Sequence, residues 1–70
     1  MDRKKVNSSR IRSVGYEESN RVLEVELNDG SIYRYTGVSP EVHRRFTSAP
    51  SIVSYYQDKI EEDFPRKRIR

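Results

Sequence analysis

Arginines in strand-like segments are the first candidates for chemistry in this chain. Arg10, Arg12 and Arg34 lie on segments that we expect to be neighbouring strands, where they could share the outer face of one sheet. Guanidinium groups on an open sheet face can contact phosphates or stack on nucleic-acid bases. Glu24 and Glu26 fall on that same face. Cross-strand ion pairing on a solvated surface is therefore the alternative interpretation, and we favour it.

Residues able to act as a nucleophile or a base are few. His43 is the single histidine, and it could serve as a general base or stack on a ligand, but we expect an ordinary surface residue of a short helix. Ser8 and Ser9 have no base at a useful spacing, so we expect them to form hydrogen bonds where a strand begins. The three glycines do not form a phosphate-binding loop. We therefore expect a protein that is not an enzyme.

Metal and cofactor sites are not expected either. The chain has no cysteine, which excludes disulfides and thiolate metal sites and fits a reducing cytoplasm, where we place the protein. Glu61, Glu62 and Asp63 are consecutive, so on a helix their carboxylates diverge instead of converging on an ion. No apolar run approaches the roughly 20 residues of a membrane span. We expect no cofactor and no membrane partner.

The net charge of +3 divides unevenly along the chain. Residues 1–5 and 66–70 hold seven Lys or Arg and one Asp, a net charge of +6, whereas residues 6–65 hold seven Lys or Arg and ten Asp or Glu, a net charge of −3. We interpret the ends as basic tails, the C-terminal one disordered, and expect contact with nucleic acid to begin there. The candidate nucleic-acid-binding residues are Arg10, Arg12, Arg34, Arg44, Arg45, Arg66, Lys67 and Arg68.

The scaffold for these residues is one small domain, residues 6–65, which we expect to be monomeric. Residues 10–17 place Ile11 out of phase with Val14 and Tyr16, so we expect a bulge near Ser13 or Gly15 that turns all three inward. Residues 21–28 alternate apolar and acidic side chains, which is typical of a half-buried strand, and residues 31–38 form the returning strand.

The turn between these last two strands decides which face holds Tyr33 and Tyr35. A two-residue loop, 29–30, would place both tyrosines with the glutamates and bury Arg34 under the helices. A three-residue loop, 28–30, places the tyrosines with the apolar residues and directs Arg34 outward. We favour the longer loop because an unpaired buried charge costs several kcal/mol. We also expect the tyrosine hydroxyls to reach the rim of the core.

Two helices complete the fold. Ser39 and Pro40 are a suitable N-cap and first residue for a short helix that Pro50 interrupts. Residues 51–64 begin at a second capping serine and carry an apolar stripe, Val53, Tyr56, Ile60 and Phe64. We therefore predict an α+β fold, a three-stranded antiparallel meander followed by two helices packed on one face, in the order β-β-β-α-α. The expected core and motif residues are Val14, Tyr16, Leu23, Val25, Gly30, Tyr33, Tyr35, Phe46, Tyr56 and Ile60.

The order of these residues also resembles a known family. The pattern consists of Val6, Ser8-Ser9, Ile11, Val14-Gly15-Tyr16, Gly30, Tyr33-Arg34-Tyr35, Val38, Pro40 and the tyrosines of the second helix. It is similar to the KTSC domain family over residues 6–64. The family is named for a segment at the C-terminus of some lysyl-tRNA synthetases and also occurs as small bacterial proteins. The chain departs from the family pattern in its second helix, at Val53, Gln57 and Glu61.

The resemblance, the basic ends and the strand arginines together lead us to expect a small non-catalytic binding module with RNA, such as tRNA, as its partner. The alternative is a protein-interaction module of unassigned role that uses an exposed sheet edge or the last helix.

Overall fold

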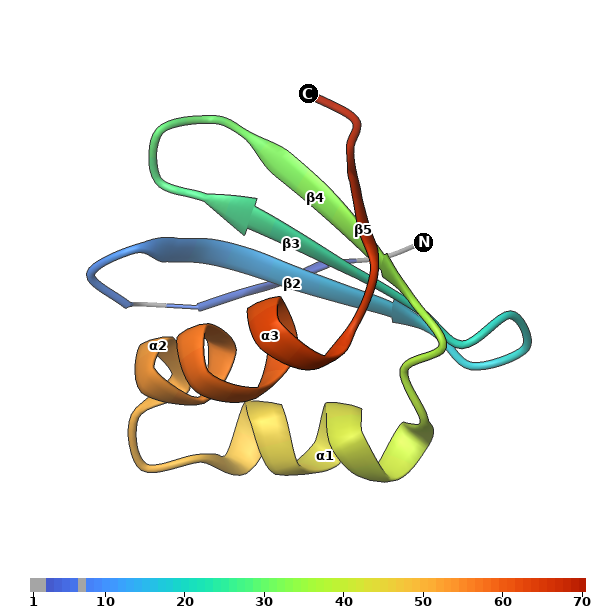
Figure 1. Cartoon of the computed structure of the whole chain (residues 1–70). Helices are drawn as coiled ribbons and strands as arrows, with labels where there is room; N and C mark the ends of the chain where they lie inside the picture. The colour runs from blue at the N-terminus through green and yellow to red at the C-terminus, as the bar shows by residue number, and fades with distance from the viewer. Residues whose placement is uncertain (1–2, 7) are drawn as a thin grey trace.

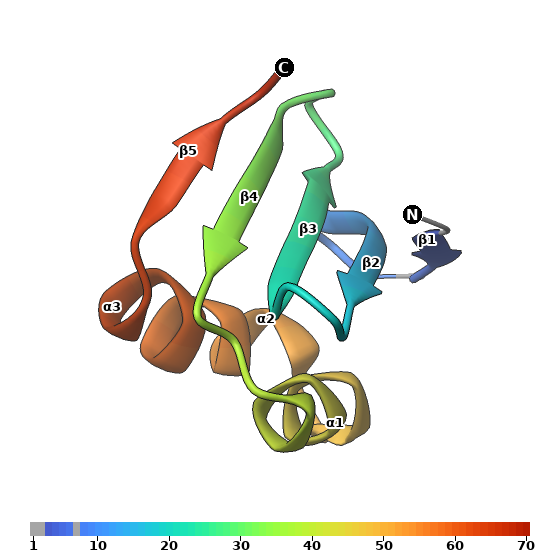
Figure 2. The same ribbon diagram turned by 90° about the vertical axis from the view of Figure 1, so that its right-hand side faces the viewer.

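The fold is built on an antiparallel sheet of five strands. The strands follow one another in chain order, from β1 at one edge to β5 at the other. Helices cover one face and leave the other open (Figures 1 and 2). This computed structural model describes residues 3–6 and 8–70. Its strands are β1 (Arg3–Lys5), β2 (Ile11–Glu17), β3 (Val22–Leu27), β4 (Ile32–Thr36) and β5 (Arg66–Arg68). Its helices are α1 (Pro40–Ser48), α2 (Ile52–Tyr55), the π-helical turn η1 (Tyr56–Ile60) and α3 (Glu61–Asp63).

The α+β class and the three expected strands are confirmed, as β2, β3 and β4 in the expected order. Two short basic strands that the sequence did not predict, β1 and β5, extend the sheet at both edges. Residues 1 and 2 of the expected N-terminal tail lie outside the described residues. No helix among residues 3–6 and 8–70 is long and apolar enough to cross a membrane.

The expectation of a disordered C-terminal tail is wrong. In β5, Arg66, Lys67 and Arg68 pair with Tyr35, Arg34 and Tyr33 of β4. Just beyond β5, the Ile32 N–H donates to the carbonyl of Arg70 at 2.8 Å. The physical reason is that β4 would otherwise leave a row of backbone N–H and C=O groups unpaired. The pairing is made by backbone groups, so β5 does not need alternating apolar and polar side chains. Because that alternation is the pattern by which a strand is recognised in a sequence, β5 was not predicted.

The expected bulge lies in β2. Ile11 pairs with Leu27 and Ser13 pairs with Glu26, so one extra residue interrupts the register between them. This insertion turns Ile11 and Val14 toward the same side, where they are 0% and 3% exposed.

The β3–β4 hairpin has the three-residue loop, 28–30, that the sequence predicted. The Leu27 N–H donates to the Ser31 carbonyl at 2.9 Å, and Gly30 has a φ of +93°, which disfavours any side chain at that position. The Asp29 carboxylate accepts hydrogen bonds from the Ser31 hydroxyl at 2.6 Å and the Ser31 N–H at 2.9 Å. These bonds lower the pKa of Asp29.

This register turns both tyrosines of β4 toward the helices, as expected. Tyr35 is fully buried and Tyr33 is half-buried. The hydroxyl of Tyr35 does not reach the rim, which corrects our expectation, because it meets the Tyr56 hydroxyl at 2.6 Å inside the core. The two rings pack edge to face with centroids 5.9 Å apart. Burial, and then the bond to Tyr35, raise the pKa of Tyr56.

The helices begin where the sequence indicated. The Ser39 hydroxyl accepts from the Val42 N–H at 3.3 Å and caps α1, whose Phe46 is fully buried. The second helix begins after Ser51 but is not regularly α-helical over 51–64. Its middle is the π turn η1, in which the Glu61 N–H donates to the Tyr56 carbonyl. The two buried residues of this helix, Tyr56 and Ile60, bound that turn, so the wider turn coincides with the segment that enters the core.

Deletion of residues 66–70 tests whether β5 is structural. The lost strand bonds, each worth a net ~0.5–1.5 kcal/mol, predict a stability loss of roughly 2 kcal/mol and a fall in Tm of roughly 10 °C. The control variant Lys67→Gln/Arg68→Gln keeps the strand and should remain within about 0.5 kcal/mol of the parent. If the truncated chain has the same Tm as the full chain, residues 66–70 do not stabilise the sheet and the structural role of β5 is contradicted.

The Tyr35–Tyr56 bond is tested by a double-mutant cycle in chemical denaturation. Tyr56→Phe leaves the buried Tyr35 hydroxyl with only a long hydrogen bond from the Arg66 guanidinium, at 3.5 Å, and should cost about 1–3 kcal/mol. Tyr35→Phe/Tyr56→Phe should recover part of that loss because neither hydroxyl then remains. Tyr55→Phe, on the same helix and half-buried, is the control and should change stability little. Equal losses for Tyr55→Phe and Tyr56→Phe would refute the assignment.

Candidate nucleic-acid interface

A row of paired residues crosses the open face of the sheet. Glu24 of β3 lies opposite Arg34 of β4, and Arg34 lies opposite Lys67 of β5. Residues opposite one another in an antiparallel pair share a face. Because Tyr33 and Tyr35 point to the helices, and side chains alternate along a strand, this row points to the other face of the sheet.

The first ion pair of this face joins Arg34 to Glu24. The Arg34 guanidinium donates to one Glu24 carboxylate oxygen from Nη2 at 2.8 Å and from Nε at 3.3 Å. The Glu24 side chain is only 10% exposed, whereas that of Arg34 is 46% exposed. A carboxylate so far removed from water needs a charged partner. Arg34 therefore stabilises the sheet as well as presenting a cation to solvent.

The second carboxylate, Glu26, has several partners. The Ser13 hydroxyl donates to it at 2.8 Å, and the guanidinium groups of Arg12 and Arg70 approach it at 3.8 Å and 3.3 Å. Its side chain is 13% exposed, against 50% for Arg12 and 65% for Arg70. The cross-strand ion pairing that we favoured is thus present on this face.

Acidic side chains on a surface repel an anionic partner, but the two glutamates of this face are covered. Glu24 and Glu26 lie beneath the arginines that pair with them, so the groups facing solvent are mainly guanidinium groups. Lys67 adds an exposed ammonium beside Arg34. The result is a surface that can offer hydrogen-bond donors to phosphate oxygens while its own negative charges are held beneath them. We define the outer face as Arg12, Arg34, Lys67 and Arg70.

The structure separates the other predicted binding residues from this face. Arg66 lies on the helix side, with its guanidinium carbon 4.4 Å from the centre of the Tyr33 ring and an ion pair to Glu61 at 3.3 Å. Arg68 pairs with Tyr33 and so shares the helix side. The remaining three lie elsewhere on the surface, Arg10 in the loop before β2, and Arg44 and Arg45 on α1.

Arg70 is the residue of the outer face that the sequence did not single out. It was counted with the basic C-terminus, but no spacing linked it to Glu26, which precedes it by 44 residues. Only the pairing of β5 with β4 brings the two together. The sequence placed Arg70 in the basic C-terminus but did not show the strand that positions it.

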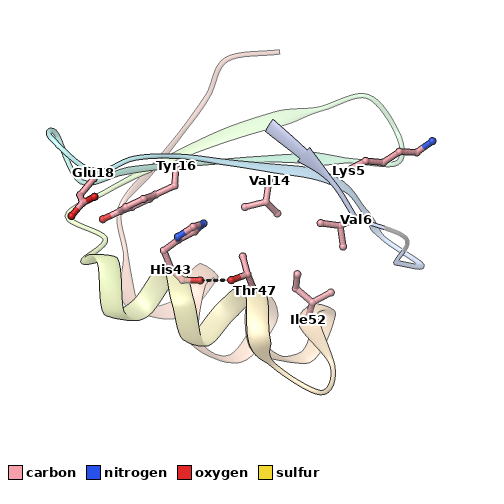
Figure 3. Close-up of a pocket in the computed structure, with 8 residues that line it drawn as sticks. All are labelled: Lys5, Val6, Val14, Tyr16, Glu18, His43, Thr47 and Ile52. Carbon is pink, nitrogen blue, oxygen red and sulfur yellow. Dashed lines mark hydrogen bonds between the residues drawn. The ribbon is translucent and has the colours of Figure 1, made fainter. Parts of the chain in front are cut away.

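A second feature lies between the β1–β2 edge and α1. The His43 ring stacks on the Tyr16 ring with centroids 4.4 Å apart and an interplanar angle of 8°, as Figure 3 shows. The Tyr16 hydroxyl donates to the Val38 carbonyl at 2.6 Å, and burial raises the pKa of Tyr16. Our expectation of an ordinary surface histidine is therefore wrong. His43 is half-buried and forms one wall of a pocket of about 610 Å³.

The remaining candidates have structural surroundings. The carbonyls of Ser8 and Ser9, not their hydroxyls, accept hydrogen bonds from the Asn28 amide at 3.1 Å and 2.9 Å. Glu61 of the acidic run pairs with Arg66. Within residues 3–6 and 8–70 there is no cluster of three His, Cys, Asp or Glu side chains that could hold a metal ion.

Comparison with known proteins agrees with the resemblance seen in the sequence. The chain is 39% identical over 56 residues to an uncharacterized protein from Stutzerimonas stutzeri, covering 80% of this chain and 79% of that one. It is 29% identical over 65 residues to a lysine–tRNA ligase from Nostoc punctiforme, covering 93% of this chain but 12% of the ligase.

A solved structure gives the same result for the fold. The crystal structure of a KTSC domain protein from Yersinia pestis superposes with a TM-score of 0.92 at 37% sequence identity, covering 99% of this chain and 97% of that chain. The model of the KTSC domain family matches residues 7–64, which hold the strands β2, β3 and β4 and all of the helices but neither edge strand, β1 or β5. The chain therefore belongs to the KTSC domain family.

Proposed function

We propose that this protein is a non-catalytic RNA-binding module that contacts the phosphate backbone through its outer face, Arg12, Arg34, Lys67 and Arg70. The observation that supports this proposal most strongly is the difference in exposure within each ion pair. The carboxylates of Glu24 and Glu26 are 10% and 13% exposed, and the guanidinium side chains above them are 46–65% exposed. An approaching polyanion therefore meets cations first.

The similarity to a lysine–tRNA ligase favours RNA among the polyanions. That protein contains a segment resembling 93% of this chain, and its name places it among proteins that handle tRNA. Phosphate contacts position a nucleic acid without reading its sequence, so we expect the outer face to bind with little sequence preference. Four cations imply a log–log salt dependence with a slope of about −3, at about 0.7 per phosphate neutralised on a single strand.

The alternative of a protein-interaction module has weaker support. The edge strand β5 consists of Arg66–Arg68, and charged edge strands resist pairing with another strand. On the last helix, the Tyr55 ring packs against Phe46 with centroids 6.0 Å apart, so part of its apolar surface is already used.

Substitution, not trimming, is the appropriate test because removal of residues 66–70 would remove β5. Lys67→Gln/Arg70→Gln leaves Glu26 with Arg12 and Ser13 and deletes two of the four cations. At 0.1 M salt each lost phosphate contact should weaken tRNA binding about fivefold, so the double variant should bind about 25-fold more weakly and its salt slope should fall by about 1.4. Fluorescence anisotropy with bulk tRNA at several salt concentrations measures both values.

The matched control is Arg44→Gln/Lys59→Gln, which removes the same charge from exposed positions on the helical layer. It should change the affinity by less than about twofold if the outer face is the interface. Equal weakening by the two double variants would show a diffuse charge effect and contradict the proposed site. Absence of tRNA binding by the parent chain at 0.05 M salt would contradict the proposed function and favour a protein partner.

A further inference from the structure

The strand β5 carries cations on both of its faces. Arg66 pairs with Tyr35 of β4, and Lys67 pairs with Arg34. Because side chains alternate along a strand, Lys67 lies on the outer face and Arg66 lies on the helix side. One short backbone positions both residues, so a contact that holds Arg66 on the helix side also determines where Lys67 lies on the other.

Arg66 contacts three residues on the helix side. Its guanidinium carbon lies 4.4 Å from the centre of the Tyr33 ring, and its Nη1 atom donates to the Glu61 carboxylate at 3.3 Å. The same Nη1 atom lies 3.5 Å from the Tyr35 hydroxyl, which is bonded to the Tyr56 hydroxyl inside the core. A guanidinium that stacks on a ring and pairs with a carboxylate is held in one orientation by both contacts.

The π turn η1 positions the carboxylate that Arg66 uses. Tyr56 and Glu61 are five residues apart, and the Glu61 N–H donates to the Tyr56 carbonyl. In a regular α-helix two residues at this spacing would differ by about 140° in direction, whereas the i→i+5 bond of a π turn brings them toward one face. Tyr56 then bonds Tyr35 while Glu61 meets Arg66, so a single turn of the helix contacts both β4 and β5.

Two of the four cations of the outer face, Lys67 and Arg70, come from β5 and the residues just after it. The Arg70 guanidinium lies 3.3 Å from the Glu26 carboxylate. Beyond the strand, pairing with β4 continues at Ile32, whose N–H donates to the Arg70 carbonyl and whose carbonyl accepts from the Ile69 N–H, both at 2.8 Å. Figure 2 shows that β5 leaves α3 and follows the edge of β4. The two cations therefore belong to the outer face only while β5 is paired.

Pairing with β4 alone gives β5 a weak attachment. The strand has three residues, all of them exposed, and it lies at the edge of the sheet, where β4 is its one neighbouring strand. Short exposed edge segments open at a low free-energy cost compared with the core of a protein. The contacts of Arg66 attach β5 to the helical layer as well, so they shift the equilibrium toward the paired strand.

We infer that Arg66 is the positioning residue of the outer face, an inference that rests on the proposed function. Its contacts with Tyr33 and Glu61 on the helix side keep β5 paired. The paired strand presents Lys67 and Arg70 to RNA on the opposite side, and Arg66 itself does not touch the RNA. Because only the paired strand completes the interface, loss of the Arg66 contacts lowers the affinity for RNA although all four cations remain in the chain.

Two matched double variants isolate these contacts. Tyr33→Leu/Glu61→Gln, here called the released variant, removes both the ring and the carboxylate that hold Arg66. Its control, Tyr33→Phe/Glu62→Gln, keeps the ring and removes the same charge from an exposed neighbour. Both variants change the net charge equally and leave the outer face intact.

Amide hydrogen exchange without RNA, followed by NMR, tests whether Arg66 holds β5. The Ile32 and Ile69 N–H groups report on this strand, and the Leu27 N–H reports on the β3–β4 hairpin. The released variant should exchange about tenfold faster at Ile32 and Ile69, with little change at Leu27, and its control should match the parent. Glu61→Gln alone, at a side chain 32% exposed, should give the same pattern at about threefold. Equal acceleration at all three amides, or none, would overturn the inference.

Fluorescence anisotropy with bulk tRNA at 0.1 M salt tests the effect on binding. Loss of a negative charge by itself strengthens binding to a polyanion, so the control should bind as the parent does or slightly more tightly. The released variant should bind about fivefold more weakly, within the roughly 25-fold loss expected when both cations of β5 are removed. Equal affinities of the released variant and its control would contradict the positioning role.

A cycle with Lys67→Gln/Arg70→Gln tests whether Arg66 acts through these two cations. In that background the released variant should weaken tRNA binding by less than about twofold, because the residues that β5 positions are already gone. The same fivefold loss in both backgrounds would overturn the inference. Failure of the parent to bind tRNA would refute the proposed function, whereas a released variant that binds like its control would refute only the role of Arg66.

Discussion

The pairing register of β3 and β4 is the constraint on which the rest of the structure depends. With Asn28, Asp29 and Gly30 as a three-residue loop, Val25 lies opposite Tyr33 and Glu24 lies opposite Arg34. A slip of one residue would exchange the two faces of β4 and place Arg34 in the core. The register therefore sends the tyrosines to the helices, where Tyr35 meets Tyr56, and sends the arginine to the surface, where it covers Glu24.

Both ends of the chain enter the sheet, and this changes the meaning of the charge distribution. The segments with a net charge of +6 are not tails around an acidic domain. Their described parts form the two edge strands, β1 and β5, on either side of an acidic middle strand. The glutamates of that middle strand lie beneath the arginines that pair with them. The negative charge on this face is therefore largely buried, and the positive charge is exposed to solvent. The proposed interface and the charged edges, which disfavour edge-to-edge pairing, are consequences of the same arrangement.

Local rules were sufficient to predict the three central strands, the bulge, the hairpin register and both serine caps. Each depends on residues close in sequence or on the alternation of apolar side chains. The strand β5 could not be predicted in this way because backbone groups make its pairing and its side chains are charged. The π turn at Tyr56–Ile60 has the same apolar spacing as an α-helix. The Tyr16–His43 stack joins a strand to a helix 27 residues later, and only the packing of α1 on the sheet brings these rings together. Three residues of the outer face, Arg12, Arg34 and Lys67, were named from the sequence as candidates, and their role in binding stays a prediction. The burial of Glu24 and Glu26 beneath the arginines could not be predicted because it requires tertiary structure.

The most direct test of this account is a set of long-range NOEs across three adjacent strands. The sheet described here predicts backbone contacts from Glu24 to Arg34 and from Arg34 to Lys67, because these residues lie opposite one another in β3, β4 and β5. The first contact tests the register, and the second tests whether the basic C-terminus is a strand. Contacts of Arg34 with Leu23 or Val25 in place of Glu24, or an Arg34 with no contact to Lys67, would contradict it.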